Sequence, residues 1–143
     1  MSHAIDVLQR AIAKAMEQRP SVGGFPHLAQ ILKEAGVLRN EWHLPACQSL
    51  YITLFGPVVM QGTPLVSGAV DVQPFSEAAL IAALRADQAG KSDFPAFLCA
   101  TWQAGVIRYE VDFEARTVTY YGVSGECYTE PYPAVVIDNS PHN

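Results

Sequence analysis

The sequence predicts an α+β domain in which an antiparallel sheet packs against four helices. Stretches with apolar residues at helical spacing precede stretches of strict alternation, and this order occurs twice along the chain. The length of 143 residues suits a single hydrophobic core. We expect two α-α-β-β-β halves, 2–60 and 75–137, a connection at 61–74 rich in Gly and Pro, and a polar tail at 138–143.

The first half is expected to begin with two helices. Residues 3–18 carry an apolar stripe, with Ser2 placed to cap the first turn. Pro26 suits the first turn of a helix over 25–35, and Gly36 suits the position that ends it. Strands are then predicted at 37–44, 49–53 and 57–60.

The second half repeats this order. Ser76 is expected to cap a helix that reaches about Gln88, and Ser92 or Asp93 caps a helix that Gly105 ends. The strongest alternation in the chain follows, and it predicts a meander of short antiparallel strands. These strands are expected at 106–113, 117–122 and 126–130, with a further edge strand at 134–137.

An internal repeat underlies this symmetry. Residues 25–59 align without gaps to residues 94–128 at a shift of 69 positions, and ten of the 35 pairs are identical. Ordinary composition gives about two identical pairs by chance. The match favours two halves related by a pseudo-two-fold axis. The alternative is that the shared letters are only the start and stop residues of any helix–Gly–strand unit.

Composition and charge disfavour several classes of function. The nine Lys and Arg are scattered and the net charge is −5, which disfavours a nucleic-acid-binding surface. No stretch approaches the roughly 18 apolar residues of a spanning helix, and the start lacks the apolar core of a secretory signal. We therefore expect a cytoplasmic protein without a membrane partner. Its three cysteines, 47, 99 and 127, are expected to be reduced.

Catalytic signals are sparse. There is no P-loop, GxGxxG, HExxH or GxSxG motif. The histidines, at positions 3, 27, 43 and 142, lack ligand spacing, so no metal or cofactor is expected. One candidate remains: His43 and Cys47 flank a proline turn and are candidates for a nucleophilic pair oriented by Asp112, the repeat counterpart of His43. The alternative is a solvent-exposed histidine beside a packed cysteine.

A ligand pocket is the second kind of candidate. Arg39 and Arg108 each lie two residues before a glutamate, on the polar face of equivalent strands. These residues either form lateral ion pairs or line a surface between the halves. The aromatic residues leave room for a cleft between the halves, a common place for ligands. The candidates for ligand contact are Arg39, Trp42, Trp102, Arg108, Glu110 and Tyr120.

One stretch of the second half resembles a known family. Residues 87–122, DQAGKSDFPAFLCATWQAGVIRYEVDFEARTVTYYG, resemble the YdfO-like (YbcV-like) family of small, often prophage-associated bacterial proteins. The residues that carry the pattern are Gln88, Gly90, Ser92, Asp93, Phe97, Gly105, Val106, Thr119, Tyr120 and Tyr121. Asp87 stands where members of the family often have His. The resemblance implies a compact α+β fold and no established activity, so no catalytic residue is carried over.

These observations favour a non-enzymatic cytosolic binding or interaction module of mobile-element type. We expect it to associate with itself as a dimer or to bind a protein partner, and a small-molecule ligand remains open. The alternative is a small hydrolase or transferase that uses Cys47 and His43. That alternative predicts an exposed Cys47 with a lowered pKa.

Overall fold

The computed structural model describes residues 2–20 and 24–137; the polar tail expected at 138–143, with His142, lies outside them. Within these residues, four helices and six strands follow the order α-α-β-β-β-α-α-β-β-β, so the α+β prediction is confirmed. The helices are α1 His3–Glu17, α2 Gly24–Glu34, α3 Glu77–Gln88 and α4 Phe94–Gln103. The strands are β1 Val37–His43, β2 Gln48–Thr53, β3 Gly56–Gln61, β4 Arg108–Asp112, β5 Thr117–Tyr121 and β6 Cys127–Pro131.

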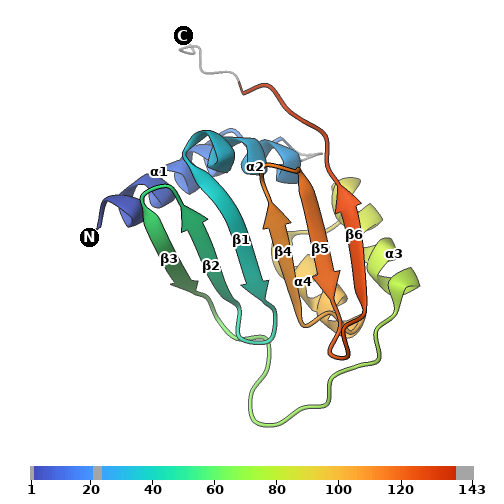
Figure 1. Ribbon diagram of the computed structural model, residues 1–143. Helices are drawn as coiled ribbons and strands as arrows, with labels where there is room; N and C mark the ends of the chain where they lie inside the picture. The colour runs from blue at the N-terminus through green and yellow to red at the C-terminus, as the bar shows by residue number, and fades with distance from the viewer. Residues whose placement is uncertain (1, 21–23, 138–143) are drawn as a thin grey trace.

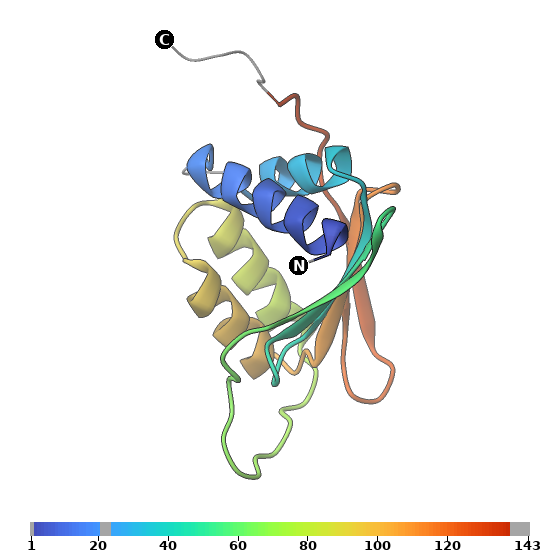
Figure 2. The same ribbon diagram turned by 90° about the vertical axis from the view of Figure 1, so that its left-hand side faces the viewer.

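All six strands form one antiparallel sheet, with the order β3-β2-β1-β4-β5-β6. The four helices cover a single face of this sheet (Figures 1 and 2). No helix of the described chain covers the opposite face, which we call the open face. The two halves lie side by side, and the pairing of β1 with β4 joins them into one sheet.

The β1–β4 junction brings repeat counterparts together. Glu41 lies directly opposite Glu110, from which it is separated by the 69-residue shift of the repeat. Arg39 lies opposite Asp112, and His43 lies opposite Arg108. The equivalent strands therefore pair antiparallel, with the Glu41–Glu110 pair at the centre.

The helix starts and stops agree with the sequence prediction. The side chains of Ser2, Ser76 and Asp93 each accept a hydrogen bond from the backbone N–H three residues further on, at 3.2, 3.2 and 2.8 Å. These bonds satisfy donors that the first helical turn leaves unpaired. Gly36 and Gly105 follow α2 and α4 with φ of +98° and +89°, in the region that favours glycine.

The core lies between the sheet and the helices and contains a layer of aromatic rings. Trp42 stacks parallel to Tyr109, with ring centroids 6.1 Å apart, and Tyr109 lies 5.6 Å from Tyr120. Phe94 of α4 meets Trp42 edge-on at 5.3 Å. The largest fully buried side chains are Phe113, Leu8, Leu44, Leu80, Val37, Val106 and Val111. Each such side chain stabilises the fold by roughly 1.5–3 kcal/mol relative to exposure.

The edge strand predicted at 134–137 is wrong. Residues 132–137 have no regular secondary structure, and the sheet ends with β6 at Pro131. Pro131 and Pro133 have no N–H to donate to a sheet ladder, which accounts for the end of pairing here. The segment still packs on the protein, because Tyr132 meets Phe25 edge-on at 5.2 Å and Ile137 is buried.

None of the helices in the described residues has both the length and the apolar character needed to span a bilayer.

Candidate functional site

The open face presents three rows of side chains that run across the strands, because paired strands place opposite residues side by side. The glutamate row consists of Val59, Leu50, Glu41, Glu110, Thr119 and Thr129. The arginine row consists of Gln61, Gln48, His43, Arg108, Tyr121 and Cys127. The aspartate row consists of Pro57, Ile52, Arg39, Asp112, Thr117 and Pro131.

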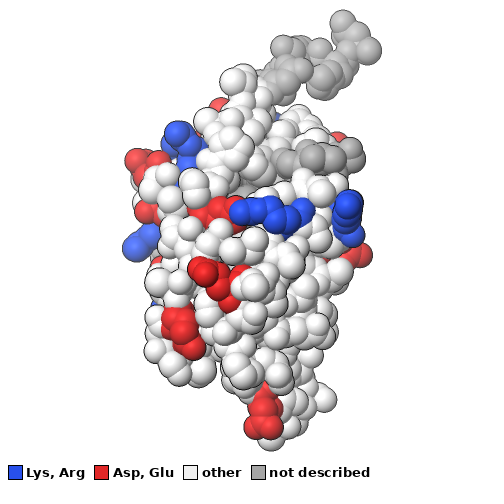
Figure 3. Space-filling model, turned by 90° about the vertical axis from the view of Figure 1, so that its right-hand side faces the viewer, with Lys and Arg blue, Asp and Glu red and all other residues white. Residues whose placement is uncertain are grey.

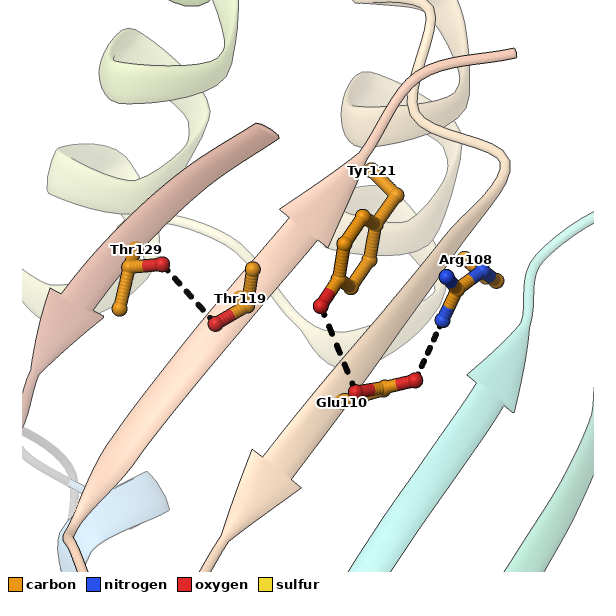
Figure 4. A network of polar contacts seen from close by, with 5 residues as sticks. All are labelled: Arg108, Glu110, Thr119, Tyr121 and Thr129. Carbon is orange, nitrogen blue, oxygen red and sulfur yellow. Dashed lines mark hydrogen bonds and ion pairs between the residues drawn. The ribbon is translucent and has the colours of Figure 1, made fainter. Parts of the chain in front are cut away.

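A polar network holds the β4–β6 side of this face (Figure 4). Arg108 Nη1 lies 2.5 Å from Glu110 Oε1, and the Tyr121 hydroxyl donates to Glu110 Oε2 at 3.4 Å. The Arg108 guanidinium also lies 3.8 Å above the centre of the Tyr121 ring. Desolvation, followed by the Glu110 carboxylate, raises the pKa of Tyr121. Further out, the hydroxyls of Thr119 and Thr129 are 2.9 Å apart.

The neighbouring β1 side chains are unpaired. Glu41 and His43 make no hydrogen bond or ion pair with any residue in the described part of the chain. Glu41 lies directly opposite Glu110, and like charges in that position destabilise a sheet. Arg108 neutralises Glu110 within the chain, so the carboxylate of Glu41 and the imidazole of His43 remain available to another molecule.

A shallow depression of about 490 Å³ lies on the open face where β1 meets β4 and β2. Its walls come almost entirely from the glutamate and arginine rows. They are formed by Glu41, Trp42, His43, Gln48, Leu50, Arg108 and Glu110. The lining combines both signs of charge with apolar surface, so the depression suits polar side chains more than a buried apolar ligand.

The structure brings together some of the predicted pocket residues and separates others. Trp42, Arg108 and Glu110 line the depression, and Arg39 lies beside it in the aspartate row. Tyr120 is instead buried in the core, and Trp102 of α4 packs against the same core. Among the described residues, three of the six candidates therefore share one depression, and the other three lie outside it.

The predicted catalytic pair does not form. His43 is exposed on the open face, whereas Cys47 is only 6% exposed and packs with the core. Burial, followed by the neighbouring Cys99, raises the pKa of Cys47, whereas the nucleophile alternative requires a lowered pKa. Asp112 lies opposite Arg39, four residues along the strands from the place opposite His43, or about 13 Å away. The Asp112 carboxylate instead accepts hydrogen bonds from the backbone N–H groups of the turn after β4.

Thiol reactivity provides a direct check of this arrangement. In the native protein we expect iodoacetamide to modify the exposed Cys99 and Cys127, and to modify Cys47 at least about tenfold more slowly. Peptide mass mapping over a time course measures the three rates. In urea the three cysteines should react alike, which serves as the control. A native Cys47 that reacts as fast as Cys127 contradicts the prediction and restores the nucleophile hypothesis.

Among the described residues, no group of three or more His, Cys, Asp and Glu side chains lies close enough to hold a metal ion. On the face of the molecule shown in Figure 3, Lys and Arg side chains are few and are interspersed with Asp and Glu. One such pairing joins Arg85 of α3 to Glu130 of β6. This face shows no extended basic patch of the kind that contacts phosphate groups.

Sequence reasoning missed Glu41, Gln48 and Leu50 as residues of the depression. The repeat contained a signal for Glu41, because it is the counterpart of Glu110. Alternation contained a signal for Leu50, which lies between the buried Ser49 and Tyr51 and therefore points to the open face. Which strands lie beside one another was not readable from either pattern.

The fold and the open face define a class: a small α+β domain whose antiparallel sheet is covered by helices on one side. The chain belongs to the DUF1398 family, described as proteins of unknown function, whose model matches residues 13–131. It is 53% identical over 135 residues to the uncharacterized protein Rv2012 of Mycobacterium tuberculosis and to the uncharacterized protein Mb2035 of Mycobacterium bovis. These matches cover 94% of this chain and 82% of each relative. None of these descriptions names an activity.

Proposed function

We propose that this chain is a non-enzymatic binding module whose open face binds a second copy of the same chain. The observation that carries the proposal is the open face itself, a six-stranded surface that no helix of the described chain covers. A one-sided sheet commonly exposes polar residues on its free face, but here apolar side chains are mixed among them. Val59 is 59% exposed and lies beside Leu50, with Ile52 in the next row.

Charge on the open face favours a second copy over a strongly charged partner. The two central strands contribute two arginines and three carboxylates to it, so the face is close to neutral although the chain carries −5. Two such faces can approach without the repulsion that the net charge would otherwise impose. Two sheets packed face to face, about 10 Å apart, form the well-known sandwich arrangement.

The expected affinity follows from the extent of the face. Six strands about 4.8 Å apart and five residues of about 3.4 Å each give a surface of roughly 24 by 17 Å. A contact of this area falls at the low end of the range for specific interfaces, so we expect a dimer with a dissociation constant in the micromolar range. The proposal includes a mobile-element origin, supported by the resemblance of residues 87–122 to the YdfO-like family. It also includes a cytoplasmic location, which the sequence predicts because no stretch has the length of apolar residues needed to span a bilayer.

The test is self-association measured by light scattering and sedimentation between about 1 and 500 μM. The wild-type mass should rise from monomer to dimer across this range. Val59→Lys should weaken the dimer at least about tenfold, because it places a charge in the contact. Met16→Lys is the matched control: Met16 is 60% exposed but lies on α1, so its change should have no effect. A strict monomer at every concentration refutes the proposed function.

A further inference from the structure

We infer that the two-fold axis of this dimer runs across the strands, between the glutamate row and the arginine row. The inference rests on the proposed self-association and specifies which residues of the two copies meet. A two-fold axis lying in the plane of the face and running across the strands reverses the direction of every strand. Each strand of the second copy then lies over the same strand of the first copy. The glutamate row of one copy faces the arginine row of the other.

This exchange converts neighbours within one chain into opposite charges across two chains. Glu110 comes to face Arg108 of the second copy, and Arg108 comes to face Glu110 of the second copy. The two ion pairs already present within the chains become one alternating array of four charges. The unpaired Glu41 faces His43 of the second copy, so each of these side chains gains a polar partner in the dimer.

Two other placements of the axis bring carboxylates together. An axis parallel to the strands, between β1 and β4, lays Glu41 on Glu110, although it also lays Arg39 on Asp112. An axis across the strands between the glutamate and aspartate rows lays Glu110 on Asp112, although it also lays Glu41 on Arg39. Juxtaposed like charges are strongly unfavourable at an interface and exclude wrong registers. The placement between the glutamate and arginine rows avoids such contacts: Arg108 meets Glu110, and Glu41 meets the imidazole of His43.

The shape of the face agrees with this placement. Six of the seven residues around the depression belong to these two rows, three to each: Glu41, Leu50, Glu110, His43, Gln48 and Arg108. The depression therefore lies along the inferred axis, where side chains of the second copy enter it. On the β2 side, Leu50 of the two copies are offset by about 7 Å along the strands, within diagonal reach across the axis.

A charge exchange between two variants tests the inference. A chain with Arg108→Glu carries carboxylates at both 108 and 110, and a chain with Glu110→Arg carries guanidinium groups at both. Each variant alone should dimerise at least about tenfold more weakly than wild type, because its own copies now repel one another. An equimolar mixture should form a heterodimer with affinity restored to within a few-fold of wild type. Native mass spectrometry separates the three dimer masses, and sedimentation gives the affinities.

The mixture distinguishes contacts between chains from contacts within one. Both variants lose the internal Arg108–Glu110 pair, and mixing cannot restore it, so recovery reports pairing between chains. The matched control is a second pair of variants, Arg10→Glu and Glu77→Lys, which change exposed helix residues. Each control variant, alone or in the mixture, should dimerise as tightly as wild type. Circular dichroism melting confirms that each variant is folded.

Two outcomes overturn the inference while self-association stands. One is a pair of single variants that dimerise as tightly as wild type, which places the contact elsewhere on the molecule. The other is a mixture that dimerises no better than its components, which places the rows in a different register. A wild-type chain that stays monomeric refutes the proposed function itself, and with it this dimer.

Discussion

Replacing Gly105 with alanine is expected to lower the free energy of unfolding by about 3 kcal/mol. The φ of +89° strains any residue with a side chain by roughly 1–2 kcal/mol. In addition, a Cβ at this position would lie 2.6 Å from both Phe75 Cα and the Pro74 carbonyl oxygen. These atoms cannot easily move aside, because the Ser76 N–H donates to the Ala104 carbonyl at 2.7 Å and ties the two segments together.

Two matched glycines separate the clash from the backbone strain. Gly36 is the repeat counterpart of Gly105 and has φ +98°, but a Cβ there meets only the side chains of Leu54 and Phe55, the nearest at 3.3 Å. Gly125 has φ +90° and a Cβ there would meet nothing within 4 Å. Alanine at either position should cost only the strain, roughly 1–2 kcal/mol. Urea unfolding followed by circular dichroism measures all three, and equal losses contradict the argument.

Unfolding between pH 10 and 12 is the second large expected effect. Burial raises the pKa of Tyr51, Tyr109 and Tyr120, and it raises the pKa of Tyr132 to about 12. Below pH 10 the tyrosines are protonated in the folded and unfolded chains alike, so their contribution is constant. Above pH 10 the unfolded chain releases protons that the folded chain retains, and the free energy of unfolding falls until pH reaches the folded pKa values. A tyrosine that stays protonated through pH 12 contributes ~2.7 kcal/mol to the fall.

Several such residues together approach the whole stability of a small domain. Tyrosinate absorbance at alkaline pH should therefore rise in the same transition that abolishes the far-ultraviolet circular dichroism. Tyr120→Phe should move the midpoint of alkaline unfolding to higher pH, because it removes one titrating group. The Tyr120 hydroxyl makes no hydrogen bond with the described residues, so its removal breaks none. Tyr121→Phe on the open face should move it less. Complete tyrosinate formation in a protein that is still folded is the contrary result.

Local features of the fold were predictable because they depend on neighbours in sequence. Ser2, Ser76 and Asp93 cap helices through bonds only three residues long. Alternation placed Arg39 and Arg108 on the polar faces of their strands, because side chains along a strand point alternately to either side. The strand expected at 134–137 failed because two prolines outweigh the preference of valine and isoleucine for strands.

The candidate site was predictable only in part, because it depends on contacts between distant segments. The sequence identified Arg108 and Glu110 as outward residues, but the register of β1 with β4 is a tertiary property. That register places Glu41 against Glu110 and keeps His43 apart from Asp112. Cys47 is likewise close to His43 in sequence, yet it packs with the core while His43 is exposed.

The β1–β4 junction also has a consequence for how the chain folds. Within each half, the strands are joined by short turns, so their pairing closes small loops. The junction instead joins residues 65 to 73 positions apart, from His43–Arg108 to Arg39–Asp112. Closing that larger loop costs more chain entropy, and contacts of long sequence separation slow folding. We therefore expect the two meanders to assemble first and the central pairing to be the later, slower step of folding.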